Sequence, residues 1–280
     1  MSYQQRKKVM KRKMTLYEKF FKRFIDVFGA VFLMVLLSPV FMIIAILVRI
    51  KHGKGVIFKQ KRVGKNRKIF WFYKFRSMSN ARDESGELLP DKDRITKFGK
   101  FIRKTSLDEL PQLWNILKGD MSFIGPRPKD IKECVFYNEQ QCDRFSVRPG
   151  ITGLAQINGR NSITQDKILE YDIQYTPKVT FWGDIKIVFK TFFVVFRRKG
   201  IDSNAGIKTD HVCCYYNDLL LGRGKITRDE YDMRVAFSRT LRVGDTMPSI
   251  DEQRQSESAV LLQKKIKKLE SHSGLESQVG

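Results

Sequence analysis

Two adjacent carboxylates, Asp108 and Glu109, lie in the stretch TSLDELPQLW. The chain around them is strongly basic, with 53 Lys and Arg against 30 Asp and Glu among its 280 residues. A carboxylate can attack phosphorus as a nucleophile, but anions repel each other, so such a site needs Mg²⁺ and arginines to gather the charge. If one carboxylate attacks and its neighbour binds the metal ion, the pair would serve phosphoryl transfer.

The alternative is that these carboxylates only begin a helix. Ser106 followed by Glu109 matches a capping box, and the helix macrodipole favours acidic residues at this end. In that register Pro111 would be the fifth helical residue, where its missing N–H leaves the Leu107 carbonyl without a partner. With Asp108 as the N-cap, Pro111 needs no donor and Glu109 is free to point elsewhere. The residues alone leave both interpretations open.

Two loops rich in Gly and Pro follow the dyad, GDMSFIGPRP and VRPGITGLAQINGR. Proline fixes the backbone and glycine allows it to approach a ligand closely, which suits phosphate or nucleotide binding. The residues that could grip substrate phosphates in and before these loops are Arg103, Arg127, Arg148, Gln156, Asn158 and Arg160.

The segment GVIFKQKRVGKNRKIFWFYKF alternates aromatic residues with cations around a turn-like GKN. The pattern predicts a short β-hairpin with strands at residues 56–62 and 68–76. Aromatic and basic groups can also form a nucleic-acid platform, but the position directly after an apolar segment favours an anionic headgroup or a diphosphate substrate. We therefore expect no nucleic acid as partner, and Arg62, Lys74 and Arg76 as possible substrate ligands.

Residues 27–48 form a run of 22 residues without a charge, long enough to cross a bilayer. Residues 1–23 carry nine Lys or Arg against one Glu, and residues 49–76 carry eleven and no acid. Both flanks therefore favour the cytoplasmic side, which a straight span cannot satisfy. The sequence predicts a re-entrant membrane helix at residues 24–50, and a single span is the alternative.

The centre and the start of this segment carry polar residues with a structural use. Pro39 breaks a helix at its middle, and the Ser38 hydroxyl can satisfy a backbone group that the proline leaves free. Arg23 and Asp26 share one helix face, and an ionised Asp near lipid needs a partner. We expect an Arg23–Asp26 pair that anchors the start of the hairpin, with a simple helix N-terminal charge as the alternative.

The last third of the chain is less informative. Residues 181–200, FWGDIKIVFKTFFVVFRRKG, are too short and too charged to span, and they predict a helix at the membrane interface or in a core. Residues 203–242 predict a helical-hairpin extension that weakly resembles small docking modules, so a homo-oligomer is one expectation. Residues 243–280 predict a disordered tail. The four cysteines lack metal-site spacing and indicate reduced thiols.

Six motifs occur in order along the chain: KRFID, the SP break, FKQKRVG, YKFRSM, RKTSLDELPQLWNILKGDMSFIGPRP and RPGITGLAQINGR. Together they closely resemble the bacterial monotopic phosphoglycosyl transferases over residues 19–202. The resemblance implies transfer of sugar 1-phosphate from a UDP-sugar to undecaprenyl phosphate, which releases UMP. It also implies the cytoplasmic face of the bacterial inner membrane, and the first step of a cell-surface glycan.

The resemblance also implies roles for individual residues. Asp108 would be the nucleophile that forms a covalent phospho-sugar intermediate, and Glu109 would bind Mg²⁺. Arg103 and Arg127 would hold substrate phosphates. The family often has Gly-Pro where this chain has Gly55-Val56, a change expected to alter rigidity rather than chemistry. The alternative function is a non-catalytic membrane scaffold for glycan-assembly enzymes.

The expected fold is α+β and mostly helical. A basic N-terminal segment, residues 1–23, and the re-entrant helix precede a cytoplasmic transferase domain at residues 51–202. That domain would contain the short β-hairpin and interfacial amphipathic helices, and the extension and tail would follow it.

Overall fold

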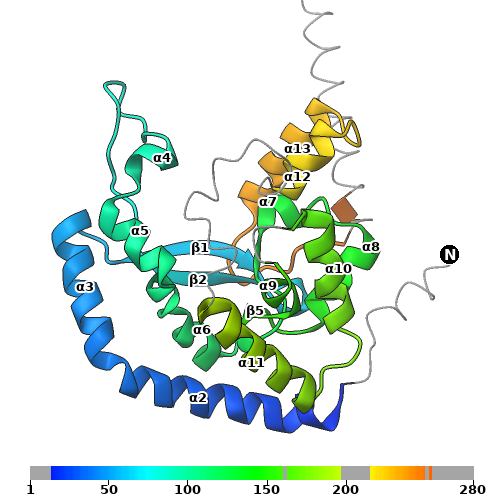
Figure 1. Cartoon of the computed structure of the whole chain (residues 1–280). Coiled ribbons are helices and arrows are strands. Elements are labelled where there is room, and N and C mark those ends of the chain that lie inside the picture. The colour runs from blue at the N-terminus through cyan, green and yellow to red at the C-terminus, as the bar shows by residue number, and fades with distance from the viewer. Residues whose placement is uncertain (1–13, 160–162, 197–214, 250–251, 254–280) are drawn as a thin grey trace, which may run out of the picture.

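The computed structural model describes residues 14–159, 163–196, 215–249 and 252–253. It is mostly helical with a small sheet, and this confirms the predicted α+β class (Figure 1).

The N-terminal helices run along the lower and left edges of the molecule (Figure 1). A π-helical turn η1 (Tyr17–Phe21) leads into α2 (Lys22–Leu36), and α3 (Ser38–His52) follows. The two halves are bent by 65°. In the described ranges no single helix is long and apolar enough to cross a membrane, but this bent pair could do so by length and composition.

The bend falls directly before Ser38 and Pro39, where the sequence predicted a break. Leu37 has φ −93° and ψ 6°, outside the helical region. The Ser38 hydroxyl donates to the Val35 carbonyl at 2.8 Å. Proline at position 39 cannot donate to that carbonyl, so the serine replaces part of the missing helical bonding.

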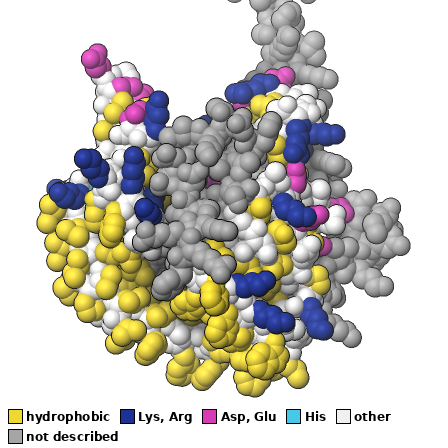
Figure 2. Space-filling model, in the orientation of Figure 1, with side chains coloured by type: hydrophobic (Ala, Val, Ile, Leu, Met, Phe, Trp, Pro, Cys, Tyr) yellow, Lys and Arg dark blue, Asp and Glu magenta, His cyan; other side chains and the backbone are white. Residues whose placement is uncertain are grey.

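Hydrophobic side chains gather on the outside of these helices (Figure 2). The same face includes α11 (Phe181–Phe196), which lies beside α2 (Figure 1). A patch of this kind marks a surface that contacts something other than water. Its exposed members include Phe24, Phe28, Phe32, Val35, Ile43, Ile46, Ile50, Trp182, Phe189, Phe192 and Phe193.

The predicted β-hairpin is present as β1 (Ile57–Val63) and β2 (Ile69–Phe75), joined by η2 (Lys65–Arg67). The strands pair antiparallel, with Phe58 opposite Lys74 and Arg62 opposite Phe70. Because alternate residues of a strand point to opposite faces, this register places Arg62 and Lys74 on the same face.

Three further strands were not predicted. The short β4 (Lys129–Asp130) extends the sheet to the order β2-β1-β4. A separate parallel pair joins β3 (Ser122–Ile124) to β5 (Gly150–Thr152). This pair brings the two Gly/Pro-rich loops together, although 18 residues lie between them in the chain.

Helix α6 (Gln112–Lys118) lies between the hairpin and α2. It is preceded by α5 (Lys97–Lys104) and the 3-10 turn η3 (Leu107–Glu109). The core between these elements is apolar and consists of Ala30, Phe70, Phe72, Leu113, Ile116 and Met121.

Short helices complete the domain. They are α4 (Asp91–Arg94), α7 (Ile131–Cys134), α8 (Glu139–Cys142), η4 (Asp143–Ser146), α9 (Leu154–Ile157) and α10 (Gln165–Tyr175).

The C-terminal extension is part of the folded domain. Helices α12 (Tyr216–Gly222) and α13 (Arg228–Thr240) pack on α7. Residues 243–249, which the sequence assigned to the tail, also fold against the hairpin, because Met247 is 1% exposed and packs in an apolar cluster with Ile69. This part of the predicted tail is therefore ordered.

Arg23 does not pair with Asp26 as expected. Its guanidinium donates to the carbonyls of Ile116 at 2.5 Å and Leu117 at 2.8 Å. These carbonyls belong to the last turn of α6, where unpaired acceptors and the helix dipole attract a cation. Arg23 thus ties α2 to the rest of the domain and not to its own helix.

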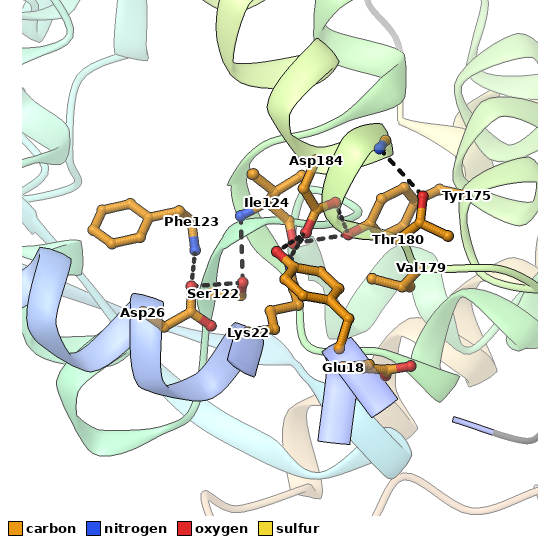
Figure 3. Close-up of polar contacts among 12 residues, drawn as sticks. Glu18, Lys22, Asp26, Ser122, Phe123, Ile124, Tyr175, Val179, Thr180 and Asp184 are labelled. Carbon is orange, nitrogen blue, oxygen red and sulfur yellow. Dashed lines mark hydrogen bonds and ion pairs between the residues drawn. The ribbon is translucent and has the colours of Figure 1, made fainter. Parts of the chain in front are cut away.

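Asp26 also ties α2 to the domain. It is buried, and one carboxylate oxygen accepts from the Ser122 hydroxyl at 3.0 Å and from the Phe123 N–H at 3.1 Å (Figure 3). A buried carboxylate needs such donors. The start of the bent helix is therefore bonded to β3.

A second buried carboxylate, Asp184, joins the N-terminal helices to α11. It is 2% exposed and accepts from Lys22 at 2.5 Å, from the Tyr17 hydroxyl at 3.0 Å and from the Tyr175 hydroxyl at 2.8 Å (Figure 3). These three donors come from η1, α2 and α10. Asp184 therefore holds together elements that are far apart in the sequence.

We expect Asp184→Asn to lower the free energy of unfolding by about 3 kcal/mol, because Lys22 would be left buried without its counter-charge. Thermal and denaturant unfolding in detergent micelles measure this loss. The control is Glu170→Gln. Glu170 forms a surface ion pair with Lys167, and its side chain is 57% exposed, so this change should lower the free energy of unfolding by less than about 1 kcal/mol. Equal losses of stability in the two variants would contradict the role of Asp184 as the buried counter-charge of Lys22.

Candidate active site

The dyad lies in the short turn η3, against β2. Neither predicted cap forms: Ser106 has a left-handed backbone with φ 58° and caps nothing, and α6 begins only after Pro111. Proline is tolerated there because the first residues of a helix have no intrahelical acceptor for their N–H groups. Asp108 and Glu109 are therefore not helix caps, and their side chains are free for other contacts.

Two cations hold the dyad. Lys74 lies 2.9 Å from a Glu109 oxygen and 3.5 Å from an Asp108 oxygen. Arg127, from the GPRP loop, forms an ion pair with the same Glu109 oxygen and reaches the second one at 3.5 Å. Lys74 therefore bridges both carboxylates, and Arg127 adds a second positive charge on the Glu109 side.

The pKa values of the two carboxyl groups shift in opposite directions. Burial raises the pKa of Asp108 above its ordinary value, and the negative charge of Glu109 adds to this, although Lys74 opposes it. Burial acts in the same direction on Glu109, but the charges and hydrogen bonds of Arg127 and Lys74 outweigh it and hold its pKa far below the usual range. Arg127 and Lys74 thus favour the ionised form of Glu109, whereas burial disfavours the ionised form of Asp108.

Arg103 lies at the edge of the same site. Its Nε donates to the Ser77 hydroxyl at 2.8 Å, and its charge is close enough to lower the pKa of Asp108. The remaining N–H groups of Arg103 can meet an anion beside the dyad.

Arg62 is on the same face of the hairpin as Lys74, opposite Phe70. The guanidinium of Arg62 is 5.8 Å and the ammonium of Lys74 5.5 Å from the centre of the Phe72 ring. Arg62 also donates to Gln60 at 2.7 Å. It therefore extends the positive surface away from the dyad.

Arg76 has a different role from the one expected. Its guanidinium donates to the backbone carbonyls of Lys54 at 2.5 Å, Gly55 at 3.3 Å and Met78 at 3.2 Å. These bonds tie the end of β2 to the segment after α3. The structure uses Arg76 to fix the backbone rather than to face the dyad.

Arg148 is also placed away from the dyad. Its Nε donates to the Gly119 carbonyl at 3.0 Å, just past the last residue of α6. The dyad precedes the first turn of that helix, so Arg148 and the carboxylates lie at its two ends.

The remaining predicted ligands lie on or beyond α9. Gln156 has both polar atoms of its amide buried without a hydrogen-bond partner. Asn158 is exposed and donates to the Leu154 carbonyl at 2.8 Å. Arg160 lies outside the described residues. None of these contacts links α9 to the dyad.

Sequence reasoning missed residues that position the site. Asn115 accepts from the Tyr73 N–H at 3.2 Å and donates to the Trp71 carbonyl at 2.6 Å, which fixes β2 against α6. A buried asparagine within an aliphatic helix was the available signal. Gly125 and Gly150 are also required, because a Cβ on either would lie 2.3 Å or less from backbone atoms of the facing loop. That close crossing sets the position of Arg127.

The sequence predicted a metal ion at the dyad. Among the described residues no cluster of three or more His, Cys, Asp or Glu could hold one. Mg²⁺, however, needs only one or two carboxylates from the protein, with water and substrate phosphates as further ligands. The Glu109 side chain is 16% exposed and that of Asp108 7%, so Glu109 is the more accessible ligand. Holding the ion requires Glu109 to give up part of its contact with Lys74 or Arg127.

The family model described as "Bacterial sugar transferase" matches residues 17–198. A match over this share of the chain shows that the protein belongs to the bacterial sugar transferase family. The matched region contains the bent helix, the hairpin, the dyad and both Gly/Pro-rich loops.

Three relatives illustrate what the chain is similar to. It is 46% identical over 191 residues to "Uncharacterized sugar transferase EpsL" of Bacillus subtilis, which covers 68% of this chain and 92% of that protein. It is 41% identical over 199 residues to "Undecaprenyl-phosphate galactose phosphotransferase" of Salmonella typhimurium, covering 65% and 42%. It is 41% identical over 193 residues to "UDP-glucose:undecaprenyl-phosphate glucose-1-phosphate transferase" of Klebsiella pneumoniae, covering 64% and 41%. The chain thus spans less than half of the two larger relatives.

We expect Lys74→Met to raise the pKa of Asp108 further, because Lys74 is the main charge that holds it down. On acidification, the ionised form of Asp108 would then be lost at a higher pH than in the wild type. Carboxyl-carbon NMR titration of labelled protein measures this. Lys59→Met is the matched control, since Lys59 lies opposite Tyr73 on the other face of the hairpin. An unchanged or lowered Asp108 pKa in Lys74→Met would contradict the assigned role.

Proposed function

We propose that the protein transfers sugar 1-phosphate from a UDP-sugar to undecaprenyl phosphate, giving undecaprenyl-diphosphate-sugar and UMP. The observation that carries this proposal is the buried Asp108 next to Glu109, with Lys74 on both carboxylates and Arg127 on Glu109. Membership of the sugar transferase family supports it, as do the printed names of the Salmonella and Klebsiella relatives. Those names differ in the sugar, galactose or glucose, so the sugar used by this chain stays open.

The first half-reaction is an attack by Asp108. One of its carboxylate oxygens forms a bond to the phosphorus that carries the sugar, and the bond from that phosphorus to the bridging oxygen breaks. UMP leaves with the bridging oxygen and its electron pair, and the sugar phosphate stays on Asp108 as an acyl phosphate. Asp108 must be ionised for this step, and the charge of Lys74 opposes the rise in its pKa that burial causes.

The second half-reaction regenerates the carboxylate. A phosphate oxygen of undecaprenyl phosphate attacks the same phosphorus, and the bond to Asp108 breaks. The product is the lipid diphosphate sugar. Because the two substrates use the same nucleophile in turn, the mechanism is ping-pong.

The cations next to the dyad are opposite in charge to the phosphate groups of both substrates. Lys74, Arg127 and Arg103 can neutralise phosphate oxygens that would otherwise repel both carboxylates. Bound Mg²⁺, held by Glu109, would supply further neutralisation of the diphosphate. A site preorganised in this way lowers the barrier because the charges need not be assembled during the reaction.

The apolar outer face of α2, α3 and α11 supports a monotopic position in the membrane (Figure 2). We infer that the bent pair enters and leaves one leaflet as a re-entrant helix, since both of its flanks are basic and the break lies at its centre. This would place the protein on the cytoplasmic face of the bacterial inner membrane, where a lipid-linked phosphate reaches the site. The reaction would then begin the synthesis of a cell-surface glycan.

We expect detergent-solubilised protein to release UMP from at least one UDP-sugar when undecaprenyl phosphate and Mg²⁺ are present. Asp108→Asn should lower the turnover at least about a thousandfold, because an amide cannot act as the nucleophile. EDTA should abolish UMP release, and added Mg²⁺ should restore it. A coupled UMP assay over a panel of UDP-sugars measures all three effects.

The matched control for the nucleophile is Asp232→Asn. Asp232 lies on α13 and forms a surface pair with Arg228 at 3.1 Å, and its side chain is 59% exposed, so its loss should leave turnover within about twofold of wild type. Undiminished turnover in Asp108→Asn, or no UMP release with any common UDP-sugar, would overturn the proposal. A protein that is inactive yet needed for glycan assembly in cells would favour a membrane scaffold instead.

A further inference from the structure

The turn between β1 and β2 has an unfavourable backbone. Asn66 has φ 55° and Arg67 φ 60°, and Lys68 N–H donates to the Lys65 carbonyl at 3.2 Å. Positive φ at both central residues is the pattern of a type I′ turn, in which asparagine is common at the first position and glycine at the second. Arg67 therefore stands where a residue without a Cβ is favoured, and its conformation is strained.

The C-terminal segment holds this strained residue. The Met247 N–H donates to the Arg67 carbonyl at 2.9 Å, and the Arg67 guanidinium donates to the Pro248 carbonyl at 3.4 Å. Thr246 forms an antiparallel bridge with Lys68. Strain of this kind persists only where surrounding contacts fix the backbone, and here residues 246–248 supply them.

The same segment also holds the first residue of β2. Ile69 N–H donates to the Asp245 carbonyl at 2.9 Å, and Gly244 N–H donates to the Ile69 carbonyl at 2.9 Å. Ile69 and Met247 are each 1% exposed and belong to one apolar cluster, which also includes Tyr216 and Leu219 of α12. Residues 244–247 thus contact the turn through backbone hydrogen bonds, and the Met247 side chain packs with Ile69 in the apolar cluster.

This segment lies outside the region that matches the family, which ends at residue 198. It nevertheless acts on the strand that carries Lys74, five residues beyond Ile69. A shift of one residue in the β1–β2 pairing would move Lys74 to the opposite face of the hairpin, away from the dyad. The conformation of the turn determines the register of a hairpin.

We propose that residues 244–248 are a clamp that fixes the strained turn at Arg67 and thereby sets the strand register that places Lys74 on the dyad. The clamp is a positioning element for the site, and its catalytic consequence rests on the function proposed above. It explains how a segment distant from the carboxylates contributes to their environment.

The test compares two substitutions in the full-length chain. Met247→Pro removes the N–H that donates to Arg67, whereas Met247→Ala shortens the side chain and keeps the N–H. We expect amide hydrogen exchange of residues 63–69 to be about tenfold faster in Met247→Pro than in Met247→Ala, since the unsupported Arg67 conformation is then lost more often. UMP release should fall in parallel, by about five- to tenfold.

Rescue by glycine separates the clamp from a general loss of stability. Adding Arg67→Gly to Met247→Pro should restore slow exchange and UMP release, because glycine adopts positive φ without strain. Equal exchange in the two Met247 variants, or no rescue, would overturn the clamp. Changed exchange with unchanged UMP release would overturn its link to Lys74. If the wild type released no UMP, the proposed function would fail, while the exchange data would still decide the clamp.

If Met247→Pro does not fold, the strain can be tested at position 67 alone. Arg67→Gly and Arg67→Ala both lose the bond to Pro248, but only alanine keeps the strain. The clamp predicts a higher melting temperature for Arg67→Gly than for Arg67→Ala, and the reverse order would overturn it.

Discussion

The structure depends on one electrostatic constraint: two carboxylates can lie side by side in a buried turn only if cations reach them. Asp108 and Glu109 are neighbours in the chain, so their repulsion cannot be relieved by moving them apart. Lys74 comes from β2 and Arg127 from the loop after β3. The hairpin register and the close crossing at Gly125 and Gly150 both serve to place these two cations.

Buried charges also attach the apolar helices to the domain. Asp26 binds β3, and Asp184 binds Lys22 together with two tyrosines (Figure 3). Such contacts depend on exact geometry and fix the position of α2 without using its apolar surface. The large apolar faces of α2, α3 and α11 are left for contact with lipid in the proposed account.

The sequence predicted the elements that have a local signal. The break before Pro39 and the hairpin around GKN depend on backbone chemistry within a few residues, and both are present. Partners distant in the chain were harder to predict: Arg23 binds α6 instead of Asp26, and Arg76 and Arg148 bind backbone carbonyls instead of facing the dyad. The sequence shows which residues are cations. Which acceptor each cation contacts depends on tertiary packing, which the local sequence does not show.

The central claim is that Asp108 becomes covalently bonded to the sugar phosphate. Mass spectrometry of protein that is mixed with an active UDP-sugar, without lipid acceptor, and quenched in acid tests it most directly. The account predicts a mass increase of one sugar phosphate on the peptide that contains Asp108, which disappears when undecaprenyl phosphate is added before the quench. Turnover with no adduct on any peptide, or an adduct on Glu109, would contradict it.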